Sequence, residues 1–439
     1  MAAGLRGMRS FTVIWAGQFV SLLGTSMTNF ALTIWAWEQT GQATALALMQ
    51  LFFFAPQVLM SPVAGALVDR WSRRRVMILS DVGAGLGTAA IFLLMRTGQL
   101  QLSYLYAAAA FMGAFQSFQF PAYSAAVTTM LEKAQYARAS GMLALAQNAS
   151  GIFGPAAAGA LIGVVGKTGI IAFDLLSILV AVSALMVVQI PRPTTAAAKR
   201  ASLLQDSLYG FRYIAARPSL LGLQLIFFMV NFTMSLCFPL VAPMVLSRTG
   251  SDTVALGAVQ SAFGAGGVAG GLLMSAWGGP RKRVNGVLLG ILGTFLLGFA
   301  PMGLGSTPAH WAAAAFLMVF FNPLANGSSQ AIWQSKVPPE VQGRVFSARA
   351  LIGQISAPVA MLITGPLTDG VLTPAMSPGG PLATAFGWLV GTGPGAGPAV
   401  LFLAMGVLGS FVSLSGYLFP HIRDVEAIIP DYDATAQAA

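Results

Sequence analysis

Long apolar runs recur along the whole 439-residue chain, and no other feature constrains its fold as strongly. A helix needs about 20 mostly apolar residues to cross a bilayer, because each residue advances about 1.5 Å through a hydrocarbon layer about 30 Å thick. Charged residues make up 8% of the sequence, whereas roughly 25% is usual in soluble proteins. The runs therefore predict an all-α integral membrane protein.

Twelve runs are long enough to span a membrane. The first six cover residues 11–37, 45–68, 76–95, 104–126, 141–165 and 170–190, and the second six cover residues 220–246, 254–278, 284–303, 309–330, 346–367 and 398–419. Connections that are rich in basic residues alternate with connections that contain few. If the N-terminus is cytoplasmic, only Arg96, Lys167 and Arg248 are external, and the other 20 of the 23 Lys and Arg residues lie inside. This positive-inside distribution predicts both termini in the cytoplasm. The expected location is a bacterial cytoplasmic (inner) membrane.

The longest connection on the cytoplasmic side, residues 191–219, separates the spans six from six. We expect an N-terminal six-helix bundle at residues 1–190, a linker at 191–219, and a C-terminal six-helix bundle at 220–439. Residues 202–216 of the linker have the apolar spacing of an amphipathic helix. A long external loop is expected at about residues 368–397.

Several other classes of protein are excluded by composition. The net charge of +10 follows from topology, with some attraction to anionic membrane lipid, so no nucleic-acid partner is expected. Cys237 is the only cysteine and the two histidines are far apart, so neither a disulfide nor a metal site is expected. The glycines of "GAGGVA" (residues 264–269) lie in an apolar run and indicate close helix packing rather than nucleotide binding. No cofactor and no enzyme activity are expected, because no set of catalytic residues is present.

One short stretch holds much of the scarce charge. It reads "GALVDRWSRRRVM" (residues 65–77) and resembles the loop motif G-x-L-x-D-R-x-G-R-[KR] of the major facilitator superfamily. The matching residues are Gly65, Leu67, Asp69, Arg70, Arg73 and Arg74, and Ser72 replaces the second glycine. The resemblance implies two pseudo-symmetric six-helix bundles and transport by alternating access, in a protein expected to be a monomer. "EKAQYARASGM" (132–142) and "PPEVQGRVFSA" (338–348) echo each other between the halves, as expected for a transporter repeat.

A second stretch, "GIFGPAAAGAL" (residues 151–161), resembles the antiporter motif in the fifth helix of the same superfamily. The matching residues are Gly151, Gly154, Pro155 and Gly159. Further stretches, including "DRWSRRRVMILSD", resemble the branch that contains macrolide efflux proteins and the enterobactin exporter. These resemblances imply an exporter.

The arginines around Asp69 have two interpretations. They can simply hold the loop in the cytoplasm, as the positive-inside rule requires. In the family the acid and arginines of this loop also bind neighbouring helix ends and lock one state of the transport cycle. The resemblance therefore implies a conformational latch at Gly65, Asp69, Arg70, Arg73 and Arg74.

Polar residues interrupt the apolar runs at helical spacing. The candidates for a substrate cavity are Gln18, Thr25, Asn29, Phe115, Gln116, Phe118, Gln119, Asn231, Asn322 and Asn326. They lie in the first, fourth, seventh and tenth runs, and by resemblance the corresponding helices line the central cavity of the superfamily. Hydrogen bonding between helices is the alternative role. Amides and aromatics without a central charge predict a bulky apolar or weakly cationic small-molecule substrate.

Two acids lie within predicted spans. An intramembrane carboxylate costs about 2.5–3.5 kcal/mol on insertion scales, so each requires a reason. Asp81 can bind the nearby arginine loop or carry protons, and Asp174 can stabilise a helix start or carry protons. We therefore treat both as candidates for proton coupling.

Three functions remain open from the sequence. The first is a proton antiporter that exports bulky amphipathic compounds such as drugs, siderophores or natural products. The second is a facilitator or importer of a lipid-like or nutrient solute, and the third is a non-transporting membrane scaffold. The motif at residues 151–161 favours export, and the polar helix faces argue against a scaffold.

Overall fold

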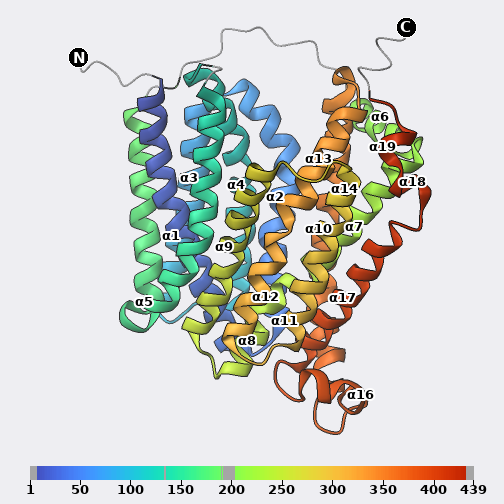
Figure 1. Ribbon diagram of the computed structural model, residues 1–439. Coiled ribbons are helices and arrows are strands. Elements are labelled where there is room, and N and C mark those ends of the chain that lie inside the picture. The colour runs from blue at the N-terminus through green and yellow to red at the C-terminus, as the bar shows by residue number, and fades with distance from the viewer. Residues whose placement is uncertain (1–6, 133–134, 189, 191–202, 432–439) are drawn as a thin grey trace. The chain divides into compact units, whose positions relative to one another are not determined.

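A computed structural model describes residues 7–132, 135–188, 190 and 203–431. Some side chains inside these ranges, including those of residues 65–70 and 203–208, are not described. The secondary structure of the described residues is helical throughout, with no strand (Figure 1). A helix satisfies its backbone hydrogen bonds internally, which is what a chain in lipid requires.

The helices are consistent with the twelve spans expected from the sequence. Ten described segments are long and apolar enough to cross a membrane. One of them, Gly141–Val187, contains two helices that meet at Gly166, whose φ of 68° breaks the helical backbone. The fourth expected span lies in a further helix, α4, of 29 residues.

The chain divides into two compact units. Unit 1 comprises Met1–Ala196 with Thr249–Ser261, and unit 2 comprises Ala197–Arg248 with Ala262–Ala439. Residues 249–261, which the sequence assigned to the second bundle, therefore belong with unit 1.

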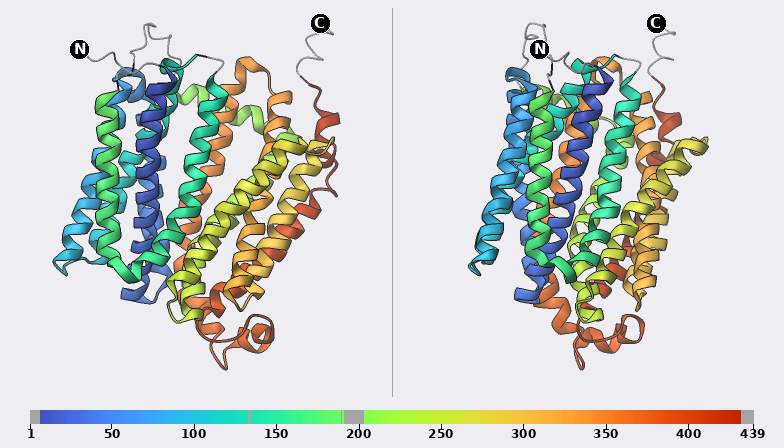
Figure 2. Two further views of the ribbon diagram at one scale, coloured as in Figure 1. Left: turned by 60° about the vertical axis from the view of Figure 1, so that its left-hand side comes forward. Right: turned by 90° about the vertical axis from the view of Figure 1, so that its left-hand side faces the viewer.

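Unit 1 is built from five long helical segments. They are α1 (Met8–Thr40), α2 (Ala43–Arg70), α3 (Arg73–Arg96), α4 (Leu102–Met130) and α5 (Tyr136–Val187). α1 packs most extensively against α5, and both α2 and α3 pack against α4. Figure 2 shows these helices running side by side along the unit. The turn after α1 uses Gly41 in the left-handed conformation (φ 60°), and its N–H donates to the Trp37 carbonyl.

Unit 2 contains more interrupted helices. Its long spans are α7 (Pro218–Cys237) with η2 (Phe238–Leu240) and α8 (Val241–Thr249); α9 (Thr253–Trp277), which starts in unit 1; α10 (Arg283–Gly293) with η3 (Thr294–Phe299) and α11 (Ala300–Leu304); α12 (Pro308–Phe320) with α13 (Asn322–Lys336); α14 (Pro339–Leu367) with η4 (Thr368–Leu372) and α15 (Thr373–Ala375); and α17 (Ala396–Ser415). The shorter helices are α6 (Leu203–Ala215), α16 (Pro381–Val390), α18 (Pro420–Arg423) and α19 (Val425–Ile428). The expected amphipathic segment is α6, which packs against α14. The expected external loop contains η4, α15 and α16.

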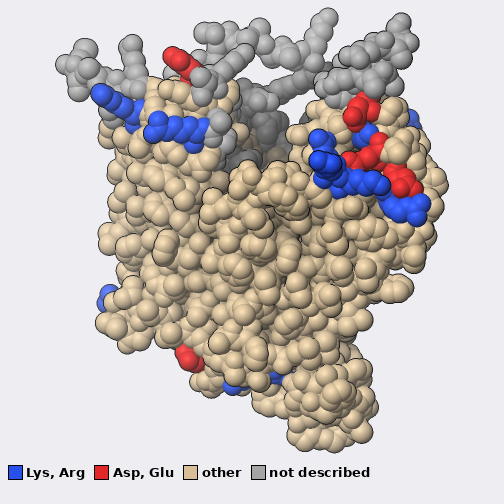
Figure 3. All heavy atoms as spheres, viewed as in Figure 1, with Lys and Arg blue, Asp and Glu red and all other residues tan. Residues whose placement is uncertain are grey.

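The outer surface of the helices is apolar. Val164 is 82% exposed, Leu59 75% and Phe411 67%. In each unit the charged side chains visible in Figure 3 lie near the helix ends, and the surface between them is uncharged. Large exposed apolar areas are unfavourable in water but match a hydrocarbon environment. The protein is therefore a multi-pass membrane protein.

The C-terminal segment of unit 2 is tied to the ends of two spans. The buried Lys336, in the last turn of α13, donates to the Glu426 carbonyl oxygen over 2.7 Å and pairs with Asp431 over 2.9 Å. The Glu426 carboxylate accepts from the backbone N–H of Val284, in the first turn of α10, over 3.1 Å. A carboxylate is favourable at a helix N-terminus and a cation near a C-terminus. The segment therefore bridges α10 and α13 by charge.

We expect Lys336→Ala to release residues 420–431 from this position. The substitution removes two charge-assisted contacts, which together contribute on the order of 1–3 kcal/mol. Faster hydrogen exchange and proteolysis of the segment in the purified protein would report the release, and Arg212→Ala, at an exposed position of α6, is the control. The hydrogen bond from Lys336 lowers the pKa of Asp431. The Asp431 contribution is therefore complete above the usual value of about 3.9 and is lost in stronger acid. Unchanged exchange in Lys336→Ala would contradict this bridge.

Candidate functional sites in the two units

A buried polar cluster in unit 1 joins three helices. Asp81 of α3 accepts a hydrogen bond from Gln18 Nε2 of α1 at Oδ2 (2.7 Å) and one from Gln119 Nε2 of α4 at Oδ1 (3.0 Å). Gln119 Nε2 also donates to Gln18 Oε1 over 2.7 Å. Asp81 is thus bound by two amides, and among the described residues no arginine or lysine pairs with it.

The bond to the arginine loop, one interpretation of Asp81, stays a prediction, because the side chain of Arg70 lies outside the described residues. The cluster engages Gln18 and Gln119, two of the expected cavity residues. Near the cluster, α4 carries two buried polar atoms that have no hydrogen-bond partner among the described residues. They are Gln119 Oε1 and the Tyr123 hydroxyl oxygen. A buried carboxylate without a cation is costly when it is ionised. The cluster can therefore gain a proton without breaking an ion pair.

Asp174, the second of the two candidate acids for proton coupling, is fully buried in α5. Its Oδ1 accepts from the Thr25 hydroxyl of α1 over 3.2 Å and from the Ser177 hydroxyl over 3.4 Å. The helices meet closely here, because a Cβ on Gly24 would lie 2.4 Å from Ser177 Oγ. Asp174 lies about two turns after the break at Gly166, beyond the first turn of the second helix of α5. Its partners are hydroxyls at the contact between α1 and α5.

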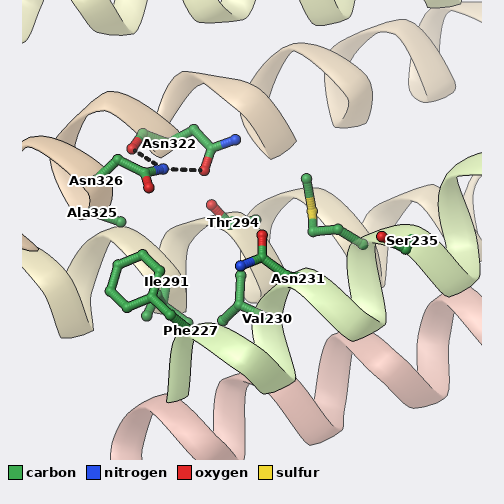
Figure 4. A pocket seen from close by; sticks show the side chains of 10 residues that line it. Phe227, Val230, Asn231, Ser235, Ile291, Thr294, Asn322, Ala325 and Asn326 are labelled. Carbon is green, nitrogen blue, oxygen red and sulfur yellow. Dashed lines mark hydrogen bonds between the residues drawn. The ribbon is translucent and has the colours of Figure 1, made fainter. Parts of the chain in front are cut away.

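Unit 2 contains a pocket of about 140 Å³ between α7, the α10–η3 junction and α13 (Figure 4). Three expected cavity residues, Asn231, Asn322 and Asn326, line it with Phe227, Val230, Met234, Ser235, Ile291, Thr294 and Ala325. Asn326 Nδ2 donates to both the carbonyl and the side-chain oxygen of Asn322, each over 3.1 Å. Figure 4 shows Asn231 on the opposite side of the pocket from this pair.

Breaks in the helices surround the pocket. Thr294 begins the π-helical segment η3, and Asn322 begins α13 directly after the turn at Phe321 and before Pro323. Such interruptions are frequent at functional sites, because they redirect side chains and loosen the regular backbone. The pocket therefore lies where two spans of unit 2 depart from regular α-helix.

The remaining cavity candidates in unit 1 lie in different surroundings. Phe118 belongs to the hydrophobic core with Ile14 and Met77. Phe115 packs over Gly83, where a Cβ would lie 2.3 Å from its ring. Gln116 is half-buried and Asn29 is exposed. The cavity-lining role of these residues stays a prediction.

The expected latch lies only partly in the described structure. Gly65, Asp69 and Arg70 are in the last turns of α2, and their side chains are outside the described residues. Arg73 and Arg74 open α3, and Arg74 donates a hydrogen bond to the Met186 carbonyl of α5. At least one arginine of the motif thus binds the end of another helix.

Sequence reasoning missed Arg349 by counting it among the cytoplasmic loop cations. It lies in α14, about 15 Å along the helix from Pro339 at about 1.5 Å per residue. It is only partly exposed and contacts side chains of α13. The signal was present, since Arg349 falls inside the expected span 346–367, and an ionisable residue inside a span indicates a functional site.

Comparison with known proteins identifies the fold. A family model described as Major Facilitator Superfamily matches residues 14–361. The chain belongs to the Major Facilitator Superfamily. Members of this family are transporters rather than enzymes, bind small-molecule substrates and usually function as monomers.

Relatives within the superfamily include exporters. Macrolide efflux protein A of Streptococcus pyogenes is 25% identical over 369 residues, which cover 82% of this chain and 90% of the relative. Enterobactin exporter EntS of Shigella boydii is 21% identical over 389 residues, covering 87% and 89%. Both relatives match the branch suggested by the sequence.

Solved structures share the superfamily fold. A bacterial homolog of the human lysosomal transporter Spinster has a TM-score of 0.66 and 15% identity, over 94% of this chain and 98% of the other. The nucleoside transporter NupG has a TM-score of 0.69 and 12% identity, over 92% and 99%. At these identities the likeness shows the fold alone.

The glycines of the antiporter-like motif allow α5 to pack closely within unit 1. A Cβ on Gly154 would lie 2.3 Å from Ser26 Oγ of α1, and one on Gly159 would lie 2.7 Å from the Thr253 carbonyl oxygen. The Thr253 hydroxyl also donates to the Gly159 carbonyl over 3.2 Å. Gly151 has open space around it, and Pro155 lies inside the helix. Gly154 and Gly159 are therefore required by packing.

We expect Gly159→Ala to destabilise the purified protein by about 1–3 kcal/mol, because the added methyl group overpacks a backbone contact. Gly163→Ala is the matched control, since its Cβ would meet nothing within 4 Å on the same helix. Alanine is the better helix former, so the control is expected to be neutral or stabilising by up to about 1 kcal/mol. Thermal unfolding in detergent measures both, and equal melting temperatures would contradict the packing role of Gly159.

Proposed function

We propose that this protein is a secondary active exporter that moves bulky amphipathic small molecules out of the cytoplasm in exchange for protons. The transport cycle is alternating access, in a bacterial cytoplasmic membrane with both termini inside. The single observation that carries the proposal is that Gln18 and Gln119 bind Asp81 and that no cation among the described residues pairs with it. The names of the two exporting relatives support the direction of transport.

Proton exchange at Asp81 would change contacts between three helices. An ionised Asp81 accepts from Gln18 and Gln119, as observed. A protonated Asp81 becomes a donor and needs an acceptor, which Gln119 Oε1 can supply because that atom has no partner among the described residues. The amide would have to turn, and this would break the bond from Gln119 to Gln18. Protonation would thereby loosen the link between α1 and α4.

Substrate would be held by amides and apolar side chains. The pocket of unit 2 offers amides from Asn231 and Asn322, with Phe227 and Met234 beside them. Burial of apolar area contributes about 25 cal/mol per Å², and the amides add orientation through hydrogen bonds. The pocket of about 140 Å³ would take part of a larger molecule, so we expect it to serve as one subsite.

The experiment is transport into inside-out vesicles that contain the protein. A radiolabelled macrolide is the first compound to test, because one relative is named for macrolide efflux, followed by a panel of amphipathic drugs and siderophores. We expect accumulation when the vesicle lumen is acidified and its loss on adding a protonophore. If uptake is insensitive to the protonophore and the internal substrate concentration never exceeds the external one, the protein is a facilitator rather than an exporter.

A further inference from the structure

Arg349 is a cation inside a span of unit 2 that has only neutral partners among the described residues. Its Nη1 donates to Gln330 Oε1 over 2.7 Å and its Nη2 donates to Ser329 Oγ over 3.1 Å. The guanidinium carbon lies 5.2 Å from the ring centre of Trp333 and 5.9 Å from that of Phe227. These contacts fix the orientation of the guanidinium group but leave its charge without a carboxylate.

We propose that Arg349 forms an anion-binding subsite, which takes the carboxylate or a similar anionic group of an amphipathic solute. The inference rests on the proposed function, and it names an acidic group as part of the substrate. It revises the expectation of an apolar or weakly cationic substrate, which assumed that the lining residues carry no charge.

The hydrogen-bond donors of this site favour the binding of an anion. A guanidinium group has five N–H donors in a planar fork that matches two carboxylate oxygens, and Arg349 uses two donors on neutral oxygens. Trp333 Nε1 is a second donor, and it is buried without a hydrogen-bond partner among the described residues. Unpaired buried donors are rare in native structures, so each needs an explanation. A bound acidic group would satisfy both residues.

The subsite adjoins the pocket described above. Phe227 lines the pocket and also faces the Arg349 guanidinium group. On α13, residues 322, 326, 329, 330 and 333 follow one another at the spacing of a single helical face. This face therefore carries pocket amides at one end and the contacts of Arg349 at the other. A solute with an apolar body in the pocket would place an acidic end at Arg349.

The test compares two fluorescent compounds that differ only in charge. Dansyl-leucine carries a carboxylate, and dansyl-leucinamide is neutral. Their dissociation constants are measured with the full chain in phosphatidylcholine nanodiscs, from the rise in dansyl fluorescence. We expect roughly tenfold tighter binding of dansyl-leucine, because a hydrogen bond to a charged group is stronger than one to a neutral group. Arg349→Gln should remove this preference by weakening the binding of dansyl-leucine.

Two variants keep the test independent of folding. Trp333→Phe retains the ring and removes only Nε1, so we expect it to lower the preference roughly threefold. Arg344→Gln, at an exposed position of the same helix, removes one charge elsewhere and should retain the preference. Equal binding of both compounds by the wild type would overturn the inference, and so would equal weakening of both by Trp333→Phe.

Lipid headgroups could supply the same chemistry, and the nanodisc composition separates the two sources. Dansyl-leucine binding should be unaffected when phosphatidylglycerol is added, and competition by this lipid would overturn the assignment to a solute. Binding is measured without a gradient, so it is independent of export. A preference without proton-driven transport would refute only the exporter proposal, and export without the preference would refute only the subsite.

Discussion

Asp81→Asn is expected to abolish accumulation of substrate under a proton gradient while preserving substrate binding and counterflow. Asparagine retains one side-chain oxygen that can accept from Gln18 or Gln119, and its NH2 group, like a protonated carboxyl, can donate to Gln119 Oε1 if that amide turns. The variant therefore resembles a permanently protonated Asp81 whose side chain stays hydrogen-bonded. It cannot gain or lose a proton in the working pH range, so a coupled cycle loses its driving force. Accumulation and counterflow are compared side by side in liposomes that contain the purified variant.

Two control variants make this result specific. Glu38→Gln removes a carboxylate that pairs with Lys167 at a more exposed position of α1, and it should accumulate substrate normally. Asp174→Asn tests the second buried acid, whose partners are hydroxyls. If Asp81→Asn still concentrates substrate and Asp174→Asn does not, proton coupling belongs to Asp174. If both variants concentrate substrate, neither acid is the proton carrier.

Asp69→Asn is expected to reduce the transport rate about tenfold or more without loss of protein from the membrane. The expectation rests on Asp69 being the single acid within the basic stretch 65–77, and on the hydrogen bond from Arg74 to the Met186 carbonyl. A contact that favours one of two states by roughly 1–3 kcal/mol changes their ratio by about 5–150-fold when it is lost. Initial rates of efflux and protein abundance are measured together in cells.

The same experiment distinguishes the latch from the topological interpretation. Asp69→Asn changes no cation, so the positive-inside distribution is unaffected and insertion should be normal. Arg75→Gln removes one cation from an exposed position of the same loop and should have little effect on rate. A wild-type rate for Asp69→Asn would show that the loop serves topology alone.

Sequence patterns predicted the individual helices well but the contacts of the site only partly. Hydropathy placed spans within most of the long helices of the structure, and helical spacing selected Asn231, Asn322 and Asn326, which line one pocket. The same reasoning assigned Gln18 and Gln119 to a cavity, which stays a prediction, and it did not foresee that both bind Asp81. Spacing along one helix cannot tell which polar face meets another helix and which meets open space.

Arg349 shows a different limit. Counting cations by loop treated it as a topological charge, and such a count could not show that its guanidinium group contacts Gln330 and Ser329 of a neighbouring helix. The glycines of residues 151–161 show the same limit. Their spacing in the sequence resembled a family motif, but only the close approach of Ser26 and Thr253 explains why positions 154 and 159 have no room for a side chain.

The sequence by itself determined that this protein is a helical membrane protein of the Major Facilitator Superfamily. Hydropathy and helical period are local properties, since each span satisfies its own backbone hydrogen bonds in lipid. The tertiary structure decided which polar side chains meet. Gln18 and Asp81 are separated by 63 residues and Gln18 and Gln119 by 101, so their bonds depend on the packing of α1, α3 and α4. Such packing is set by shape and by small residues at helix contacts, which no single segment encodes.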